Sequence, residues 1–213
     1  MAATSGEPVG RTARKRADIL TEATALFLRN GFRGTSMDEI AAAARVSKQT
    51  VYKQFADKET LFREIVEGVT GNSDTIVATI HQAFGEPVTT HDELEDRLAS
   101  VARTYLDGVL QPHVLSLRRL IIAEADQFPD LAESYYALAP TRGIDVVAGN
   151  LKHYVRAGLL TVDNVRLAAS HFAYLTLSPA QDRVLFMPTK LPSSRERSRL
   201  CRAAARAFVR AYR

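Results

Sequence analysis

The sequence predicts an all-α protein of about nine helices, and three observations support this fold class. Apolar residues recur at helical spacing along most of the chain, and no stretch of useful length alternates with period two. Ser, Thr, Asp, Gly and Pro stand where such helices would begin and end. Hydrophobic residues make up 46% of the 213 residues, which is enough for an ordinary buried core.

The N-terminal segment combines a polar stretch with a first helix. Residues 1–10 are small and polar with Gly and Pro, so we expect them to be disordered. From Arg11 the pattern becomes helical and continues to Asn30. Gly31 then supplies the left-handed residue that commonly ends a helix.

Two short helices follow. In "TSMDE", Ser36 and Glu39 have the spacing of a capping box, which predicts the start of the compact helix "IAAAA". After a brief turn, Ser47 is a good N-cap for a third helix over 48–54 that has barely two turns.

Six further helices complete the chain. We expect them over about 58–84, 92–110, 112–127, 129–158, 163–177 and from Ser193 or Ser194 to the C-terminus. Gly68 and Gly71 weaken the first of these and predict a bend. Pro140 predicts a kink in the fourth.

Charge is unevenly distributed along the chain. Residues 1–63 hold 11 Lys and Arg against 7 Asp and Glu, residues 64–189 hold 9 against 16, and residues 190–213 hold 8 against 1. This asymmetry indicates a basic end that meets a polyanion and an acidic middle that does not.

Several classes of protein are excluded by composition. No window approaches the roughly 18 to 20 apolar residues of a membrane span, and the N-terminus lacks the apolar core of a secretory signal. The single cysteine, Cys201, excludes a disulfide framework within the chain, and the five histidines have no metal-ligand spacing. We therefore expect a cytoplasmic protein without a membrane partner, metal site or cofactor.

The two short helices and their turn form a helix-turn-helix pattern. On a helical wheel, Val51 and Phe55 fall on one side of the third helix and should face their own domain. The polar residues of the other side are Lys48, Gln49, Tyr52 and Lys53, with Thr50 at the edge. Such groups can contact base edges and phosphates in a major groove. The pattern alone also fits a solvated helix face.

The surrounding residues resemble a known family. The run "ILTEATALFLRNGFRGTSMDEIAAAARVSKQTVYKQFADKETLF" is similar to the N-terminal domain of the TetR family of bacterial transcription regulators. Its blocks "ALFLRNGFRGTSMDEIA", "VSKQTVYKQF" and "DKETLF" occur in order and at the family's spacing. The resemblance implies a DNA-binding domain over 11–63, with the helix-turn-helix motif at 36–55.

The resemblance also implies which residues contact DNA. Lys48, Gln49 and Thr50 would contact bases, and Tyr52 and Lys53 would contact backbone or base. The phosphate candidates that it gives are Lys58, Thr35 and Ser36. Independently of the resemblance, the helix starts at Ser36, Ser47 and Asp57 present backbone N–H groups that suit phosphate oxygens. Replacing Gln49 should alter base preference, whereas replacing Lys58 should weaken binding to all sequences.

Residues 64–213 exceed what DNA contact requires. In the family this part forms dimers and encloses a pocket for a small ligand, and "LRRLIIAEADQFPDLAESYY" resembles the AefR-type C-terminal domain. The candidate ligand contacts are Tyr105, Tyr136, Phe172 and Tyr174. Each of these aromatic side chains could instead belong to the core.

The last helix is amphipathic. Its apolar face carries Leu200, Ala204, Ala207, Phe208 and Ala211, and its opposite face carries Arg195, Arg199, Arg202, Arg206, Arg210 and Arg213. Small apolar residues allow close helix packing, so this face could form a dimer interface with the helix at 163–177 or dock on the chain's own core. The arginines could pair with the acidic middle, remain solvated, or meet DNA or an anionic membrane.

The expected function is therefore that of a transcriptional regulator, by default a repressor. It would bind a palindromic DNA operator as a homodimer, with its two recognition helices about 34 to 36 Å apart, and be released by a small-molecule effector. An architectural or recombinase-accessory DNA-binding protein is the alternative. An enzyme is disfavoured because the sequence has no glycine-rich phosphate loop, no G-x-S-x-G and no H-E-x-x-H.

Overall fold

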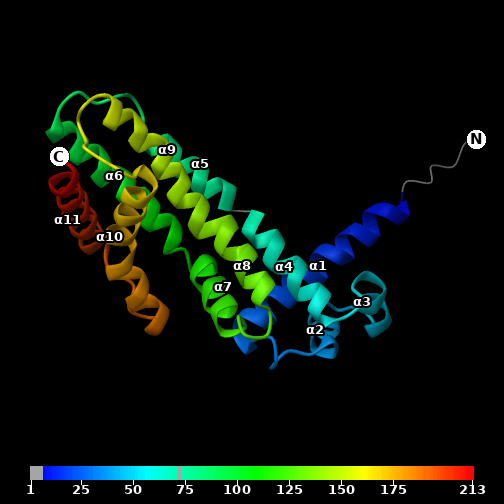
Figure 1. Ribbon diagram of the computed structural model, residues 1–213. Helices are drawn as coiled ribbons and strands as arrows, with labels where there is room; N and C mark the ends of the chain where they lie inside the picture. The colour runs from blue at the N-terminus through cyan, green and yellow to red at the C-terminus, as the bar shows by residue number, and fades with distance from the viewer. Residues whose placement is uncertain (1–6, 72) are drawn as a thin grey trace, which may run out of the picture. The chain divides into compact units, whose positions relative to one another are not determined.

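The computed structural model describes residues 7–71 and 73–213, and all regular structure in those ranges is helical. It comprises eleven α-helices and one π-helical turn (Figure 1). The predicted all-α class is confirmed, with more helices than the expected nine. None of the described helices is both long and apolar enough to cross a lipid bilayer.

The chain forms two compact units. The first unit contains residues 7–69 and Ser116–Ala132, and the second contains Thr70–Leu115 and Glu133–Arg213. The helices of the first unit are α1 (Glu7–Asn30), α2 (Met37–Ala43), α3 (Lys48–Gln54) and most of α4 (Lys58–Gly71). Those of the second are α5 (Ser73–Ala83), α6 (His91–Val109), α9 (Arg142–Arg156), α10 (Val165–Phe186) and α11 (Ser194–Tyr212). Helices α7 (Pro112–Ala123) and α8 (Pro129–Tyr136) contribute residues to both units.

Two predicted boundaries at the N-terminal side differ in the structure. Helix α1 begins at Glu7, so residues 7–10 of the expected disordered segment are helical, and residues 1–6 lie outside the described residues. The single helix expected over 58–84 is described as α4 and α5, which lie on either side of residue 72. The bend predicted at Gly68 and Gly71 falls next to this residue, which is itself outside the described ranges.

Proline affects the C-terminal helices in two ways. At Pro140 the chain widens into the π-helical turn Ala137–Thr141 between α8 and α9, as expected of a residue that lacks an N–H group and crowds the preceding turn. Pro179, in contrast, lies inside α10, which continues to Phe186 rather than ending near Leu177. The helix continues because Ala180, Gln181 and Val184 keep burying one side of it, and this burial outweighs one lost hydrogen bond.

The core of the first unit is built around four phenylalanines. The ring centroids of Phe27 and Phe62 lie 5.2 Å apart, and those of Phe32 and Phe128 lie 4.8 Å apart. Edge-to-face and tilted pairs at such distances are favourable beyond the apolar area that they bury. Phe128 comes from the segment between α7 and α8, so distant parts of the sequence share this core.

The second unit is organised around α6, which packs against α5, α10 and α11. Leu98, Leu106 and Phe208 are fully buried there, and Phe172 packs edge-to-face on Phe208 at 5.3 Å. Cys201 is buried in the same core, and this burial raises the pKa of its thiol to about 11. The thiol is therefore neutral near pH 7 and acts as a small core residue.

Candidate nucleic-acid interface

The start of α2 is fixed by the predicted capping box, which the structure confirms. The backbone N–H of Glu39 donates to Ser36 Oγ at 3.2 Å, and the backbone N–H of Ser36 donates to Glu39 Oε2 at 2.8 Å. These hydrogen bonds from Ser36 lower the pKa of the Glu39 carboxyl. The associated stabilisation is present above the carboxyl's ordinary pKa and is lost as the pH falls through the lowered one.

Helix α3 is stabilised by a cap at its N-terminus and by the burial of its inner side. Ser47 Oγ accepts a hydrogen bond from the backbone N–H of Thr50 at 3.1 Å, which caps the helix. Val51 and Phe55 are 0% and 1% exposed, so the inner side predicted by the helical wheel is confirmed. The turn before the helix places Arg45 at a φ of 54°, a left-handed conformation in an L-residue that lets α3 follow α2 closely.

The outer side of α3 presents a contiguous polar surface. Lys48, Gln49, Tyr52 and Lys53 are exposed, and Thr50 is half-buried at the edge. Lys48 Nζ lies 2.5 Å from Asp38 Oδ2 of α2, and the Thr50 and Ser47 hydroxyl oxygens are 2.8 Å apart. An amide, a phenol and two ammonium groups on one short exposed helix can donate to and accept from base edges and can neutralise phosphates.

Two of the predicted phosphate contacts, Lys58 and Thr35, have partners inside the unit. Lys58 Nζ donates to the carbonyl oxygens of Phe32 and Thr35 at 2.9 and 2.8 Å and lies 4.3 Å from the Phe32 ring centroid. The Thr35 side chain is buried and donates to the Gly31 carbonyl at 2.9 Å. Lys58 and Thr35 therefore close the turn between α1 and α2, and Lys58 retains only limited capacity for a phosphate.

A hollow of about 510 Å³ lies beside these residues. Its lining comprises Arg33, Gly34, Thr35, Ser36, Met37, Asp38, Glu39, Tyr52, Asp57 and Lys58. It contains the start of α2, where backbone N–H groups favour an anion, although Asp57 and Glu39 oppose one. Asp57 caps α4 by accepting from the Thr60 N–H at 2.7 Å, and hydrogen bonding from Thr60 lowers the pKa of its carboxyl.

The segment that joins α7 to α8 docks on the turn that precedes α2, which the sequence did not indicate. Glu124 Oε1 accepts from the backbone N–H of Phe32 at 3.2 Å, and Arg33 Nε donates to Gln127 Oε1 at 3.4 Å. These contacts join the turn between α1 and α2 to residues more than 90 positions later, and a contact between such distant residues leaves no local signal in the sequence.

Helix α4 is tied to the first turn of α8 by an ion pair. Arg63 donates to both carboxylate oxygens of Asp130, at 2.5 and 3.3 Å, and the guanidinium group of Arg63 lowers the pKa of the Asp130 carboxyl. The pKa of Arg63 is raised, chiefly by its hydrogen bond to Asp130. Arg16 of α1 donates to Glu64 at 2.7 Å and stacks over the Phe55 ring.

The four candidate ligand contacts lie in different surroundings. Tyr105 and Phe172 are buried in the core of the second unit, whereas Tyr136 and Tyr174 are 53% and 54% exposed. Two buried polar groups that the sequence did not single out lie on α10. Thr176 Oγ1 and Gln181 Nε2 have no hydrogen-bond partner in the described part of the chain. Nowhere within that part do three or more His, Cys, Asp or Glu side chains form a group able to hold a metal ion.

The apolar face of α11 is partly buried and partly exposed. Ala204 and Phe208 are buried in the core of their own unit, and Leu200 packs against that core. Ala207 and Ala211 are exposed. The core of the second unit thus covers most of the apolar face of α11, which the sequence pattern alone could equally have assigned to a dimer interface.

Two family models match the chain. Residues 19–65 match bacterial regulatory proteins of the tetR family, and residues 96–213 match the C-terminal domain of AefR-like transcriptional repressors. The first match covers the capped α2–α3 motif described above, and the second covers more than half of the chain.

Individual relatives agree with these matches. The chain is 28% identical over 189 residues to the HTH-type transcriptional regulator AcrR of Shigella flexneri. This alignment covers 85% of this chain and 83% of that protein. A crystal structure of a TetR-family transcriptional regulator from Mesorhizobium loti superposes with a TM-score of 0.81 at 35% identity, over 95% of this chain and 98% of that one. The flavonoid-responsive regulator FrrA superposes with a TM-score of 0.68 at 27% identity, over 94% and 98% of the two chains. The matched families and relatives are transcriptional regulators and not enzymes.

Proposed function

Because this chain belongs to the TetR family of bacterial transcriptional regulators, we propose that it is a cytoplasmic repressor that binds a palindromic operator as a homodimer and releases it when a small effector binds. Residues 11–63 would carry DNA recognition, and residues 64–213 would carry effector binding and dimerisation. In this proposal the operator overlaps a promoter, and bound protein blocks transcription.

The observation that carries the proposal is the outer face of α3. Gln49, Tyr52 and Lys53 are exposed on a helix whose other side is anchored by two fully buried residues. A helix of two turns is only marginally stable in isolation. Packing of its buried side against the core of the unit therefore stabilises α3 and holds its polar side rigidly at the surface. Rigid presentation of hydrogen-bonding groups is what direct readout of bases requires.

The homodimer is supported by an apolar surface on α10. Tyr174 and Leu175 are 54% and 42% exposed, and with Ala211 of α11 they line a hollow of about 710 Å³. Phe186, at the end of the same helix, is 86% exposed. Exposed apolar side chains gathered on one helix mark an interaction surface, and the partner that we propose for it is a second copy of α10 and α11 in a two-fold arrangement.

The effector site we propose lies along the buried side of α10. Phe172 offers apolar contact there, and Thr176 and Gln181 offer polar atoms that no described residue satisfies. Buried polar groups without partners are uncommon, so an effector with a hydrogen-bonding group is expected to use them. Because the relative FrrA is named as flavonoid-responsive, flavonoids are a reasonable first class to try.

Release of DNA would follow from the helices that the two units share. Residues of α7 and α8 belong to both units, and α4 passes from the first into the second. An effector that favours one arrangement of these helices would shift the docked segment at Glu124 and the start of α8 at Asp130. A coupling of about 1 to 3 kcal/mol, typical of allosteric proteins, is enough to change operator affinity 5- to 150-fold.

Footprinting of the purified protein on the DNA around its own gene tests this function. We expect protection of one short palindrome, which weakens when an effective flavonoid is added. Extended protection without a defined motif, or strongly bent DNA, would support the architectural alternative instead. Protection that no compound in a broad screen alters would contradict the switching part of the proposal and leave DNA recognition standing.

A further inference from the structure

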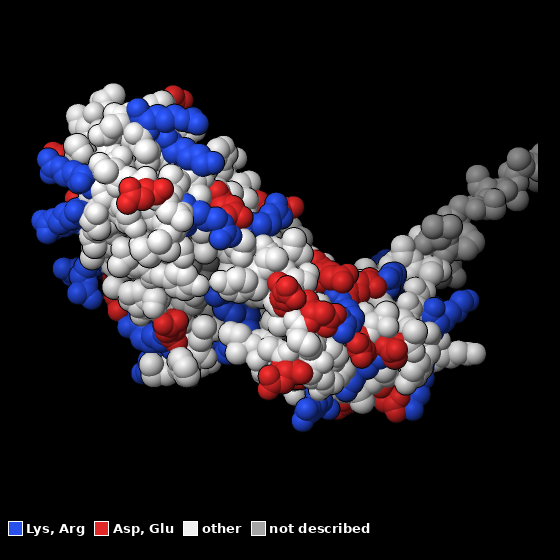
Figure 2. All heavy atoms as spheres, viewed as in Figure 1, with Lys and Arg blue, Asp and Glu red and all other residues white. Residues whose placement is uncertain are grey.

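Helix α11 carries an arginine surface that the proposed function does not use. Residues 194–213 contain seven arginines and a single acidic residue, Glu196. Figure 2 shows blue side chains along the edge of the second unit where Figure 1 places α11. We define the arginine stripe as the four exposed residues Arg195, Arg199, Arg202 and Arg206.

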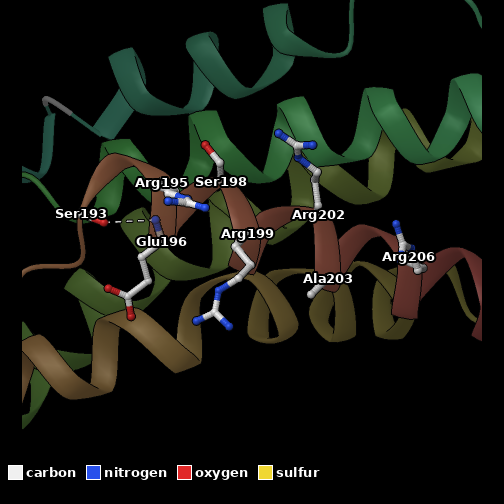
Figure 3. A pocket seen from close by; sticks show the side chains of 8 residues that line it. All are labelled: Ser193, Arg195, Glu196, Ser198, Arg199, Arg202, Ala203 and Arg206. Atoms are coloured by element: carbon white, nitrogen blue, oxygen red, sulfur yellow. Dashed lines mark hydrogen bonds between the residues drawn. The ribbon is translucent and has the colours of Figure 1, made fainter.

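The stripe lines a hollow of about 710 Å³ on the outer side of the helix. The remaining lining residues are Ser193, Glu196, Ser198 and Ala203. Figure 3 shows the four arginines projecting from successive turns of α11, with Arg199 and Arg202 directed to opposite sides of the helix axis. The buried side of the same helix carries Cys201, Ala205 and Phe208, so the stripe faces away from the core.

Internal pairing does not account for these charges. Asp107 is bonded by Arg103 at 2.6 Å and pairs with Arg197 at 3.0 Å, while Glu196 accepts from Arg183 at 2.9 Å. Within the stripe, Arg206 pairs with Glu95 at 3.0 Å. The side chains of Arg195, Arg199 and Arg202 make no hydrogen bond or ion pair with any described residue, although the charge of Arg199 helps to lower the pKa of the Glu196 carboxyl.

Stability does not account for the stripe either. Like charges three or four positions apart on a helix repel, at a cost of a few tenths of a kcal/mol per pair. Arginines at this spacing on an exposed face therefore weaken the helix slightly, and a partner with negative charge would relieve the repulsion.

We propose that the arginine stripe is a second, sequence-independent DNA-binding surface, which contacts phosphates outside the operator. The twelve residues from Arg195 to Arg206 span about 16 Å, the length of about five phosphates along one strand. Guanidinium groups bind phosphate oxygens in pairs of parallel hydrogen bonds, and the stripe contains no lysine.

Two other classes of partner fit less well. A membrane-binding helix inserts its own apolar side chains, but those of α11 are buried in the core of the second unit. A protein partner is usually held by aromatic or large aliphatic anchors at the centre of the interface, and the stripe is flanked only by serines, Glu196 and Ala203. A surface that offers positive charge without apolar anchors is suited to a polyanion such as DNA.

The test compares three full-length proteins on a duplex of mixed sequence that lacks the operator. The first is wild type, and the second carries Arg195→Gln, Arg199→Gln and Arg202→Gln. The third carries Lys152→Gln, Arg156→Gln and Lys190→Gln, which remove the same charge from exposed positions elsewhere in the second unit. Binding is followed by fluorescence anisotropy between about 50 and 200 mM salt, the range over which phosphate contacts are strongly weakened.

The stripe variant is expected to bind the mixed duplex at least about tenfold more weakly at low salt, with a salt slope reduced by about 2 to 3. The control variant should retain the wild-type slope. Slopes that are equal in the stripe variant and the control would overturn the proposal. So would a stripe variant that loses binding only to phosphatidylglycerol vesicles or to polyglutamate, because the surface would then serve a membrane or an acidic protein.

Two additional measurements keep the result interpretable. A variant with Arg195→Lys, Arg199→Lys and Arg202→Lys should keep most of the salt slope, which a folding defect would not allow. On a short operator duplex the glutamine variant should show the same base preference as wild type. If wild type binds no operator but the stripe still determines binding to mixed DNA, the proposed function fails and this inference stands.

Discussion

Replacing Phe128 with alanine is expected to lower the free energy of unfolding of the first unit by about 3 to 5 kcal/mol. The Phe128 ring is 3% exposed and lies 4.8 Å from the ring centroid of Phe32 and 5.4 Å from that of Phe62. Its removal leaves a cavity between α1, α4 and the segment that joins α7 to α8. Urea unfolding followed by circular dichroism at one fixed protein concentration measures the loss.

Ile122→Ala is the matched control for this substitution. Ile122 lies on α7 of the same unit and is 62% exposed, so its truncation should change the free energy of unfolding by no more than about 0.5 kcal/mol. If Phe128→Ala costs as little as the control, the docked segment does not contribute to the core of the first unit. The account of α7 and α8 as links to that unit would then be wrong.

Introducing aspartate at Tyr174 and Leu175 together is expected to convert the proposed homodimer to a monomer. A two-fold interface would bury four new carboxylates, and a combined cost of only about 3 kcal/mol weakens association about 100-fold. Sedimentation at micromolar concentration measures the change directly. Operator binding should weaken with it, because each palindromic site requires two recognition helices.

The control for the dimer prediction places the same charges elsewhere. Ile122 and Tyr136 are 62% and 53% exposed outside the proposed surface, so aspartate at both should leave the sedimentation of the protein unchanged. A wild-type monomer, or a dimer that persists in the Tyr174 and Leu175 variant, would show that α10 is not the contact.

The sequence predicted those parts of the fold that local chemistry determines. The capping box of Ser36 and Glu39, the Ser47 cap and the left-handed Gly31 all act within a few residues, and the structure confirms them. The division of α3 into a buried and an exposed side followed from helical periodicity alone. The family resemblance then gave this motif a role that periodicity could not supply.

Features that depend on distant residues could not be predicted. Nothing near Lys58 indicates that its ammonium group binds two carbonyl oxygens of the turn between α1 and α2. The continuation of α10 through Pro179 depends on burial against other helices. For α11, an apolar stripe predicts a buried face but does not say whether the chain's own core or a second copy covers it.

Selection of binding sites from a random duplex library, with wild type and Gln49→Ala in parallel, tests the central claim that the outer face of α3 recognises DNA sequence. Wild type is expected to select a palindrome whose half-sites are centred about 34 to 36 Å apart, and Gln49→Ala should lose preference at one position of each half-site, a change of about 1 to 3 kcal/mol. Glu67→Gln, on exposed α4 of the same unit, should select the wild-type motif. An unchanged motif with Gln49→Ala, or no motif with wild type, would contradict the claim.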